Sequence, residues 1–431
     1  MLDVRTYSPR QRVGGDLVQR GFLLDDALIR EAEDIVAGVR DGRAGALLNY
    51  VREHGGAGVE METLRISEAD IAASRDQVSE QFLTSLSIAR VNIRRFHEYQ
   101  RRKGYVYDDG EGVRLTRQVR PIARVGMLCG HSFMALLMHA VPAQVAGVKQ
   151  IAVAVAPNED GTVDPKILAT ARGLGLDELY RMSGAEAVAA MALGIGPVAR
   201  VDKIVGPGGK RAVAAKRSLS CLVGVDGELG LGELVVVADG GANAKFIAGD
   251  LLAQAEHGSC GPLTLLTNDR MLAEAVRIEI NRLAELLPDS GQTLAVINEC
   301  GAIYLLPDLE TAVDVANAIA PARLSLQTMD NDLYLPEIET AGAVFVGPWA
   351  AEMTGDYFAG LNSFLPAFGS ARYRSGLGVD DFTRETAIVE YGPERLSMTG
   401  RHMVRLAEEE SLPAHAEAVK ERLDVLRLTV E

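Results

Sequence analysis

The sequence is poor in cysteine, in aromatic residues and in positive charge. Its 431 residues include 4 cysteines, 1 tryptophan and 5% aromatic residues, and the formal net charge is −15 at pH 7. A protein that binds nucleic acid needs a basic face to neutralise phosphates, so this charge argues against that class. We therefore expect the partner to be a small molecule.

The four cysteines follow no recognisable pattern. Cys129, Cys221, Cys260 and Cys300 are widely scattered, and no C-x-x-C pair occurs. This spacing indicates neither a disulfide framework nor a cysteine zinc knuckle. We expect buried reduced thiols, and a catalytic cysteine is the alternative.

Long apolar runs are also missing. The N-terminus, M-L-D-V-R-T-Y, lacks the basic start and apolar core of a secretory signal. The most apolar stretch, residues 133–157, is interrupted by Gln144, Lys149 and Gln150, which argues against a membrane span. The sequence predicts a cytoplasmic protein without membrane contact, and its 48% hydrophobic residues allow a large core.

The spacing of the apolar residues predicts the fold class. Residues 1–110 indicate mostly helix, because apolar residues recur three and four positions apart. From about residue 120, short β-branched runs alternate with Ala-rich helices, and the alternation returns between about residues 232 and 370. This pattern is typical of βαβ units, in which helices cover both faces of a parallel sheet. We predict an α/β protein whose last 50 residues form a charged helical tail.

The stretch D-L-L-A-Q-A-E-H-G offers two side chains that are able to hold a metal ion. Gln254 and His257 are three positions apart on a predicted helix that ends at Gly258. Residues at this spacing project from one face of a helix, as paired metal ligands do. The alternative is that His257 only caps the end of the helix.

Three other segments contain candidate functional groups. The stretch at residues 205–217 is a Gly-rich turn that opens an Ala-rich helix, as an anion-binding turn would, but Ile204 and Arg211 do not fit a Walker A loop. Its alternative role is a turn that needs positive φ. Asp356 lies in a Gly-punctuated loop after a strand, a common place for functional carboxylates, and His415 lies in the tail segment P-A-H-A-E.

Many short motifs follow one another in a fixed order. They include V-D-K-I-V-G-P-G, A-A-K-R, V-G-V-D, D-L-L-A-Q-A-E-H, G-D-Y-x-A-G-x-N, A-R-Y-x-S-G-L and L-x-A-H-A-E-A-V. Together they resemble the histidinol dehydrogenase family over nearly the whole chain. The resemblance implies two incomplete Rossmann-like domains with parallel sheets, bound zinc, and an intertwined homodimer with shared active sites.

The resemblance also implies where the domains begin and end. An N-terminal arm is expected at residues 1–20. A larger α/β domain is expected to combine residues 21–125 with residues 230–371, and a second Rossmann-like domain to span residues 126–229. Residues 372–431 are expected to form a tail that completes the active site of the partner subunit.

By the same resemblance, four residues are expected to bind zinc. Gln254, His257 and Asp356 come from one subunit, and His415 comes from the tail of the other. A mixed set of nitrogen and oxygen ligands suits zinc better than a soft metal, and it leaves room for substrate atoms.

Two glutamates also match family positions. Glu410, five residues before His415, matches the tail glutamate that holds the amino group of the substrate in the family. Glu352, four residues before Asp356, lies where the family also tends to have a glutamate. We expect Glu410 or Glu352 to handle a proton.

The chain departs from the family at the residues that carry protons. The family segment A-P-E-H-L, whose Glu and His serve as general base and acid, is A-P-A-R-L here, with Ala322 and Arg323. The histidine of the family's G-x-N-H loop is replaced by Ser363. Losing such an acid or base typically costs about 10²–10⁴ in rate, and Arg323 cannot substitute because it stays protonated. Histidinol oxidation is therefore not expected, and we expect Arg323 to hold a carboxylate or other oxyanion of the substrate.

The cofactor side departs as well. Family positions with a tyrosine, a glutamine, an asparagine and a serine are occupied by Leu128, Glu186, Gly209 and Gly232. Glu186 would repel a pyrophosphate unless it is paired, so we assign no cofactor-binding residues and the use of NAD is in doubt. His131 and His139 are either new pocket residues or ordinary loop and helix-surface histidines.

Three interpretations follow. The first is a zinc-dependent enzyme that acts without oxidation, by hydrolysis or elimination, on a small molecule with an amine and a carboxylate, since zinc provides an electrophile and a nucleophile. Glu410, Glu352 and Arg323 are its catalytic candidates. The second is an NAD-dependent, zinc-containing dehydrogenase of a small polar alcohol or aldehyde. The third is a catalytically silent zinc-binding homologue.

Overall fold

The chain folds into two compact units. The structure is a computed structural model that describes Leu2 and residues 4–7, 25–227, 232–258, 261–288 and 290–428. One unit comprises Met1–Gln100 and Ile122–Phe382, and the other comprises Arg101–Pro121 and Thr383–Glu431. Most of the predicted N-terminal arm, residues 1–20, lies outside the described residues.

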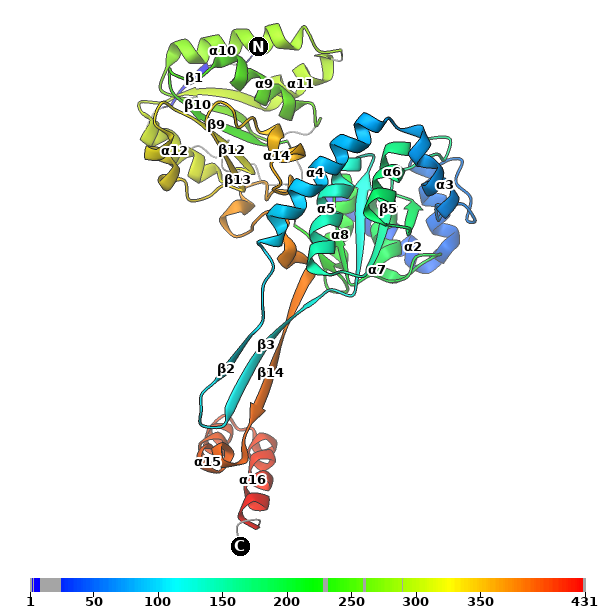
Figure 1. Ribbon diagram of the computed structural model, residues 1–431, viewed down its shortest axis with the longest axis vertical. Helices are drawn as coiled ribbons and strands as arrows, with labels where there is room; N and C mark the ends of the chain where they lie inside the picture. Colours follow the sequence, from blue (N-terminus) through cyan, green and yellow to red (C-terminus); the bar gives the residue numbers. More distant parts are fainter. Residues whose placement is uncertain are drawn as a thin grey trace. The chain divides into compact units, whose positions relative to one another are not determined.

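The first unit contains two parallel sheets, which confirms the predicted α/β class (Figure 1). The larger sheet has six strands in the order β1-β11-β10-β9-β12-β13, and all its pairs are parallel. Its strands are β1 (Val4–Thr6), β9 (Leu234–Ala238), β10 (Leu263–Thr267), β11 (Gly301–Leu305), β12 (Arg323–Gln327) and β13 (Ala343–Val346).

Helices cover both faces of the larger sheet. In β9, Val236 packs toward one face with residues of α9, α10 and α11, whereas Val235 and Val237 pack toward the other face with α12. Burial on both faces explains why these strands are continuous apolar runs. Figure 1 shows α12 on the side of the sheet opposite to α9, α10 and α11. The helices are α9 (Ala244–Ala255), α10 (Arg270–Ala284), α11 (Ser290–Cys300) and α12 (Leu309–Ile319).

The smaller sheet has five parallel strands in the order β6-β5-β4-β7-β8. These are β4 (Arg124–Gly130), β5 (Gln150–Val155), β6 (Leu179–Arg181), β7 (Lys203–Val205) and β8 (Gly224–Val225). Helices α3, α4, α5 and α6 share a core with one face, and α2, α7 and α8 share a core with the other. Their bounds are α2 (Asp26–Glu53), α3 (Glu68–Ala73), α4 (Glu80–Glu98), α5 (Phe133–Ala146), α6 (Pro165–Leu174), α7 (Gly184–Leu193) and α8 (Gly209–Leu219).

The N-terminal helices therefore pack on the smaller sheet. The domain boundaries drawn from the sequence group residues 21–125 with the larger sheet instead, and those boundaries stay a prediction. Short helical turns complete the first unit: η1 (Ser74–Gln77), α13 (Asn331–Tyr334), η2 (Leu335–Glu337), α14 (Met353–Tyr357), η3 (Ser370–Arg372) and η4 (Val379–Phe382).

The second unit joins a three-stranded antiparallel sheet to a helical hairpin. The strand order is β14-β3-β2, with β2 (Tyr105–Asp108), β3 (Val113–Pro121) and β14 (Thr383–Tyr391). Helices α15 (Pro393–Glu409) and α16 (Pro413–Leu428) follow. The predicted helical tail is thus confirmed, whereas the apolar pattern of residues 1–110 does not predict strand β2.

Two expectations about the whole chain are tested by the described residues. No helix among them is both long and apolar enough to cross a membrane. Cys129 is a buried free thiol, but Cys221 is exposed and Cys300 is disulfide-bonded. The expectation of buried reduced thiols is therefore wrong for Cys221 and Cys300.

Candidate functional site

Three of the four predicted metal ligands lie on the wall of one cavity in the first unit. The cavity has a volume of about 270 Å³, and Gln254, His257 and Asp356 line it together with Arg323 and Ser363. The structure thus brings three predicted ligands together with Arg323.

Both sheets of the first unit contribute to this cavity. Gly232 and Arg323 line it from the larger sheet, where Gly232 precedes β9 and Arg323 begins β12. Ser132 and Pro207 line it from the smaller sheet, where they follow β4 and β7. The amino ends of the larger sheet's strands therefore face the same space as the carboxyl ends of the smaller sheet's strands.

The end of α9 positions Gln254 and His257. The helix ends at Ala255, earlier than the predicted Gly258, and the backbone N–H of His257 donates to the carbonyl of Gln254 at 3.3 Å. Gln254 is fully buried, and neither atom of its amide makes a well-aligned hydrogen bond with another described residue. Leaving a buried polar group unsatisfied costs about 1–3 kcal/mol, so this amide indicates a site built for a ligand.

Asp356, brought in by α14, is shared between His257 and Arg323. Its Oδ2 lies 4.0 Å from Nε2 of His257, and its Oδ1 accepts a hydrogen bond from Nη2 of Arg323 at 3.0 Å. Nη2 also donates to the carbonyl of Ser363 at 3.0 Å, and Nε lies 3.1 Å from Oε2 of Glu352. The guanidinium, in a residue only 6% exposed, therefore holds two carboxylates at once.

Glu352 and Ala322 lie behind the cavity wall. Glu352 is 1% exposed, and its burial raises the pKa of its carboxyl to about 7, although the charge of Arg323 acts to lower it. Ala322 is buried with Leu365 in a small apolar cluster, and its N–H donates to Oε2 of Glu233 at 3.2 Å. Its side chain is therefore a packing element.

The two predicted tail residues belong to the second unit. Glu410 follows α15 as its C-cap, and the backbone N–H of His415, in the first turn of α16, donates to the carbonyl of Leu412 at 3.1 Å. Both side chains are exposed. Their roles as amine-binding residue and fourth zinc ligand stay predictions.

The donors in the cavity fit a zinc ion. Gln254 offers an unpaired amide oxygen, His257 an imidazole and Asp356 a carboxylate oxygen, which are ligand types that zinc accepts. No three His, Cys, Asp or Glu side chains gather as a metal group in the described part of the chain. One of the present donors is an amide, and the charge of Arg323 adjoins the only carboxylate among them.

A second cavity, of about 810 Å³, adjoins the first and shares Ser132 and Pro207 with it. Loops that follow β4, β5, β6 and β7 line it, and helices α7 and α8 begin at Gly184 and Gly209 on its wall. Open α/β sheets bind ligands at the carboxyl ends of their strands, and helix N-termini favour phosphate groups. The cavity therefore lies where an open α/β sheet usually binds its ligand.

Glu186 in this cavity is paired, which removes the sequence-based ground for doubting NAD. Its Oε2 lies 3.3 Å from Nδ1 of His54. Burial raises the pKa of Glu186, and the charge of His54 acts to lower it. His54 follows α2, and no spacing rule in the sequence connects it with Glu186, so the sequence analysis missed this pair.

The Gly-rich stretch at residues 205–211 is a turn that needs positive φ. Gly206 has φ +106, and a Cβ atom there would lie 2.0 Å from the carbonyl oxygen of Leu128. Gly209 has φ +69 with open space around it. The same turn lines the larger cavity through Gly208, Gly209 and Lys210. The alternative of a turn that needs positive φ is confirmed, and anion binding by the turn stays a prediction.

The two histidines of uncertain role have different environments. His131 lines the larger cavity, as a new pocket residue would. His139 is neither a pocket wall nor a helix-surface residue, because it is fully buried. Its Nδ1 lies 2.6 Å from the carbonyl of Ala135, and its ring lies 4.1 Å from that of Phe364. The expectation for His139 is therefore wrong.

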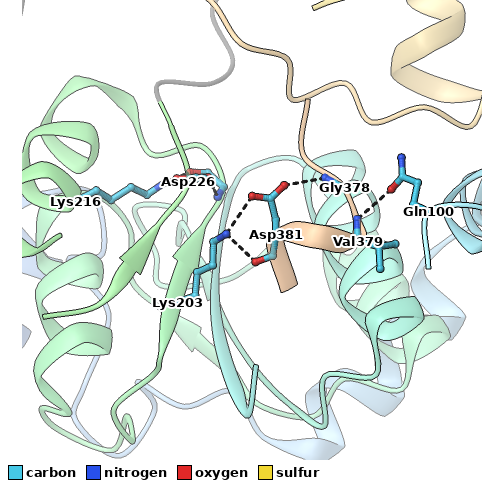
Figure 2. A network of polar contacts seen from close by, with 8 residues as sticks. Gln100, Lys203, Lys216, Asp226, Gly378, Val379 and Asp381 are labelled. Atoms are coloured by element: carbon cyan, nitrogen blue, oxygen red, sulfur yellow. Dashed lines mark hydrogen bonds and ion pairs between the residues drawn. The ribbon is translucent and has the colours of Figure 1, made fainter. Parts of the chain in front are cut away.

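Several motifs that carried the family resemblance form a structural network (Figure 2). Lys216 of A-A-K-R makes a buried ion pair of 2.6 Å with Asp226 of V-G-V-D, and Asp226 also accepts from the N–H of Gly206 at 2.6 Å. Nζ of Lys203 donates to the carbonyl of Asp381 at 2.7 Å. These contacts fasten the Gly-rich turn and the segment before β14 to the smaller sheet.

The fold and the two neighbouring cavities define an α/β protein with a small polar cavity beside a larger one, and comparison with known proteins gives the family. A sequence model of the family described as Histidinol dehydrogenase matches residues 19–423. Histidinol dehydrogenase from Bacillus cereus is 38% identical over 412 residues, covering 95% of this chain and 95% of that protein. The enzyme from Rhizobium meliloti is 39% identical over 405 residues, covering 91% and 93%.

A solved structure agrees with the sequence comparisons. The crystal structure of histidinol dehydrogenase from Elizabethkingia anophelis matches with a TM-score of 0.91 and 30% identity, over 99% of each chain. The chain belongs to the histidinol dehydrogenase family, as the order of its motifs predicted.

Proposed function

We propose that the protein is an oxidoreductase that uses a nicotinamide dinucleotide and zinc to oxidise a small polar alcohol or aldehyde other than histidinol. The cavity of about 810 Å³ beside the ligand cavity supports this proposal best. Its volume falls within the roughly 300–1,000 Å³ that is usual for small-molecule and cofactor sites. Its partly neutralised Glu186 allows a pyrophosphate to approach.

The residues of this chain have separate tasks in the proposal. A bound nicotinamide supplies a hydride acceptor, and a bound zinc ion supplies a Lewis acid. Gln254, His257 and Asp356 would hold the zinc. The backbone at the start of α7 and α8, together with Lys210, would hold the phosphates of the dinucleotide.

Arg323 is proposed to select the substrate. Its Nη1 makes no hydrogen bond or ion pair with the described residues, although Nε and Nη2 are engaged. A guanidinium with free N–H groups on a cavity wall favours a carboxylate or another oxyanion. The proposed substrate therefore carries such a group, and Glu410 from the tail of a second subunit would bind its amine.

A non-oxidative reaction is the second candidate function, and one observation favours it. Ala322, Arg323 and Ser363 stand where the family has its proton carriers, and the guanidinium of Arg323 is held between Asp356 and Glu352. Hydrolysis or elimination needs fewer positioned acids and bases, because zinc itself lowers the pKa of bound water to about 7. Glu352 or Glu410 would then carry the proton.

The deciding experiment is a calorimetric titration of the zinc-loaded, full-length protein with NAD⁺, with zinc measured in the same sample. Binding between roughly 1 μM and 1 mM, the usual range of substrate constants, supports the oxidoreductase. A Lys210→Glu variant should then bind NAD⁺ at least tenfold more weakly, since it adds a negative charge to the cavity wall. Lys245→Glu, an exposed lysine on α9, serves as the matched control.

The other outcomes separate the remaining interpretations. One zinc per chain without NAD⁺ binding contradicts the oxidoreductase and supports the non-oxidative enzyme. The catalytically silent homologue is supported if zinc removal dissociates the assembly and no turnover of small amino alcohols is found. Absence of both zinc and NAD⁺ binding contradicts both proposed functions.

We also propose that the protein is a homodimer. In the second unit, Leu115 is paired with Tyr107 of β2 and with Val389 of β14, so the three side chains form one row across the sheet. They are 38%, 55% and 64% exposed, respectively. Exposed apolar side chains on so small a sheet indicate a protein–protein interface. The family resemblance implies that the binding partner is a second copy of this chain.

A further inference from the structure

We infer that Arg323 weakens metal binding in the ligand cavity, because its permanent positive charge competes with a divalent ion for Asp356. The inference rests on the zinc site of the proposed function and concerns the affinity of that site. It makes Arg323 a residue that sets metal affinity in addition to any contact with substrate.

The two carboxylate oxygens of Asp356 contact different residues. One carboxylate oxygen, Oδ1, is bound to Nη2 of Arg323 at 3.0 Å. The other, Oδ2, lies 4.0 Å from Nε2 of His257, and Gln254 lines the same cavity. A metal ion held by Gln254 and His257 would therefore have to share this carboxylate with the guanidinium.

The positive charge of Arg323 also opposes a divalent ion in the cavity. Among the three donors only Asp356 bears a negative charge, and Glu352, 3.1 Å from Arg323, is the other carboxylate in contact with the guanidinium. A divalent ion on the Asp356 carboxylate would lie beside the positive charge of Arg323, and the two charges would repel each other. The repulsion is strengthened by the low effective dielectric constant around Arg323, which is 6% exposed.

A purely structural role for Arg323 predicts a different result. If the guanidinium only ties β12 to α14, its removal destabilises the protein and leaves metal affinity unchanged or lowers it. If it competes for Asp356, a neutral residue at position 323 leaves the carboxylate free for the metal. The two roles move metal affinity in opposite directions.

The test is zinc affinity, measured on metal-stripped full-length protein by competition with a chromophoric chelator. Arg323→Leu and Arg323→Gln should bind zinc at least tenfold more tightly than the natural protein, which corresponds to about 1.4 kcal/mol. Arg323→Lys keeps the charge and should stay within threefold of the natural protein. Gln254→Leu removes a proposed ligand and should bind at least tenfold more weakly, which shows that the titration reports this cavity.

Each outcome has a defined meaning. Equal or weaker affinity in the Leu and Gln variants overturns the inference. Thermal melting of the metal-free variants shows whether each is folded, and either folded variant is sufficient for the test. If neither the natural protein nor any variant binds zinc in a manner that depends on Gln254, the zinc site of the proposed function fails, and the inference fails with it. Tight binding by the variants alone supports the inference.

Discussion

Arg323 has two proposed roles, in binding the substrate and in setting the metal affinity, and its contacts limit both. The sequence shows that a guanidinium cannot carry protons at neutral pH. The structure adds that Nε and Nη2 are occupied by Glu352, Asp356 and the carbonyl of Ser363. Only Nη1 remains for the oxyanion that the sequence assigns to Arg323, so any such contact with substrate is made through one nitrogen.

His139 is a buried histidine that should make stability depend on pH. Complete burial lowers the pKa of its imidazole to about 4, whereas an unfolded chain has a histidine pKa of about 6.5. The native state therefore prefers the neutral ring. The resulting stability is present above about pH 6.5 and is lost as the pH falls toward 4, by an amount on the order of 3 kcal/mol.

Replacing His139 by asparagine tests this prediction. His139→Asn has no titrating group but keeps a donor for the carbonyl of Ala135, so its unfolding free energy should fall less between pH 7 and pH 4.5 than that of the natural protein. Urea unfolding at several pH values measures the difference. His131→Asn, at an exposed position, should leave the pH profile unchanged, and an equal slope in the His139 variant would contradict the assignment.

At the residue scale, the sequence indicates candidate metal ligands but not the side chains that contact them. Gln254 and His257 are found by helical spacing, and Asp356 by family resemblance. The contact between Arg323 and Asp356 spans 33 residues and depends on how β12 and α14 pack together. The sequence also does not predict that His139 is fully buried. Because α5 is apolar on nearly all sides, no apolar stripe shows which of its residues face the core.

At the scale of elements, the ligand cavity lies at an unusual edge of the larger sheet. Gly232 and Arg323 lie at or before the amino ends of β9 and β12. Ligands of open α/β sheets usually bind at the carboxyl ends, near a switch point in strand order. The smaller sheet follows that rule and the larger one does not. Strand order alone therefore does not predict the part of the site that the larger sheet contributes.

The Gly-rich turn before α8 should tolerate substitution unequally. At Gly206 an added Cβ would meet the carbonyl oxygen of Leu128 at 2.0 Å, and φ is +106, whereas Gly209 has φ +69 and open space. Gly206→Ala should therefore destabilise the protein by more than about 2 kcal/mol, and Gly209→Ala by roughly 1 kcal/mol. Chemical unfolding of both variants measures the ranking, and a reversed order would show that the turn can relax.

At the scale of the whole molecule, the sequence predicts the α/β fold class. It does not predict which helix packs on which sheet or which distant strands pair. Alternating strands and helices predict the α/β class, and amphipathic spacing predicts the helices near residues 25–40 and 78–97. An apolar stripe does not specify the sheet on which a helix packs. The pairing of β3 with β14 places Pro121 beside Thr383. These residues are so far apart in the sequence that no local pattern predicts their contact.

The exposed row formed by Tyr107, Leu115 and Val389 tests the proposed dimer. Val389→Glu places a charge in the row and should weaken self-association at least tenfold, since burial of an unpaired charge opposes assembly. Sedimentation equilibrium over a range of concentrations measures the effect. Gln118→Glu, paired with Thr386 on the opposite face of β3 because successive residues alternate, is the matched control. A natural protein that stays monomeric at all concentrations would contradict the dimer.

The strand pairings also set the order in which the protein can be completed as it is synthesised. Strand β1 pairs with β11, and the side chains of Arg5 and Tyr304 that contact each other there are 299 residues apart. At a synthesis rate of about 5–20 residues per second, β1 waits roughly 15–60 seconds for its neighbour, and β3 waits nearly as long for β14. During translation, β1 is therefore made long before its neighbour β11, and β3 has β2 on one edge but not yet β14 on the other.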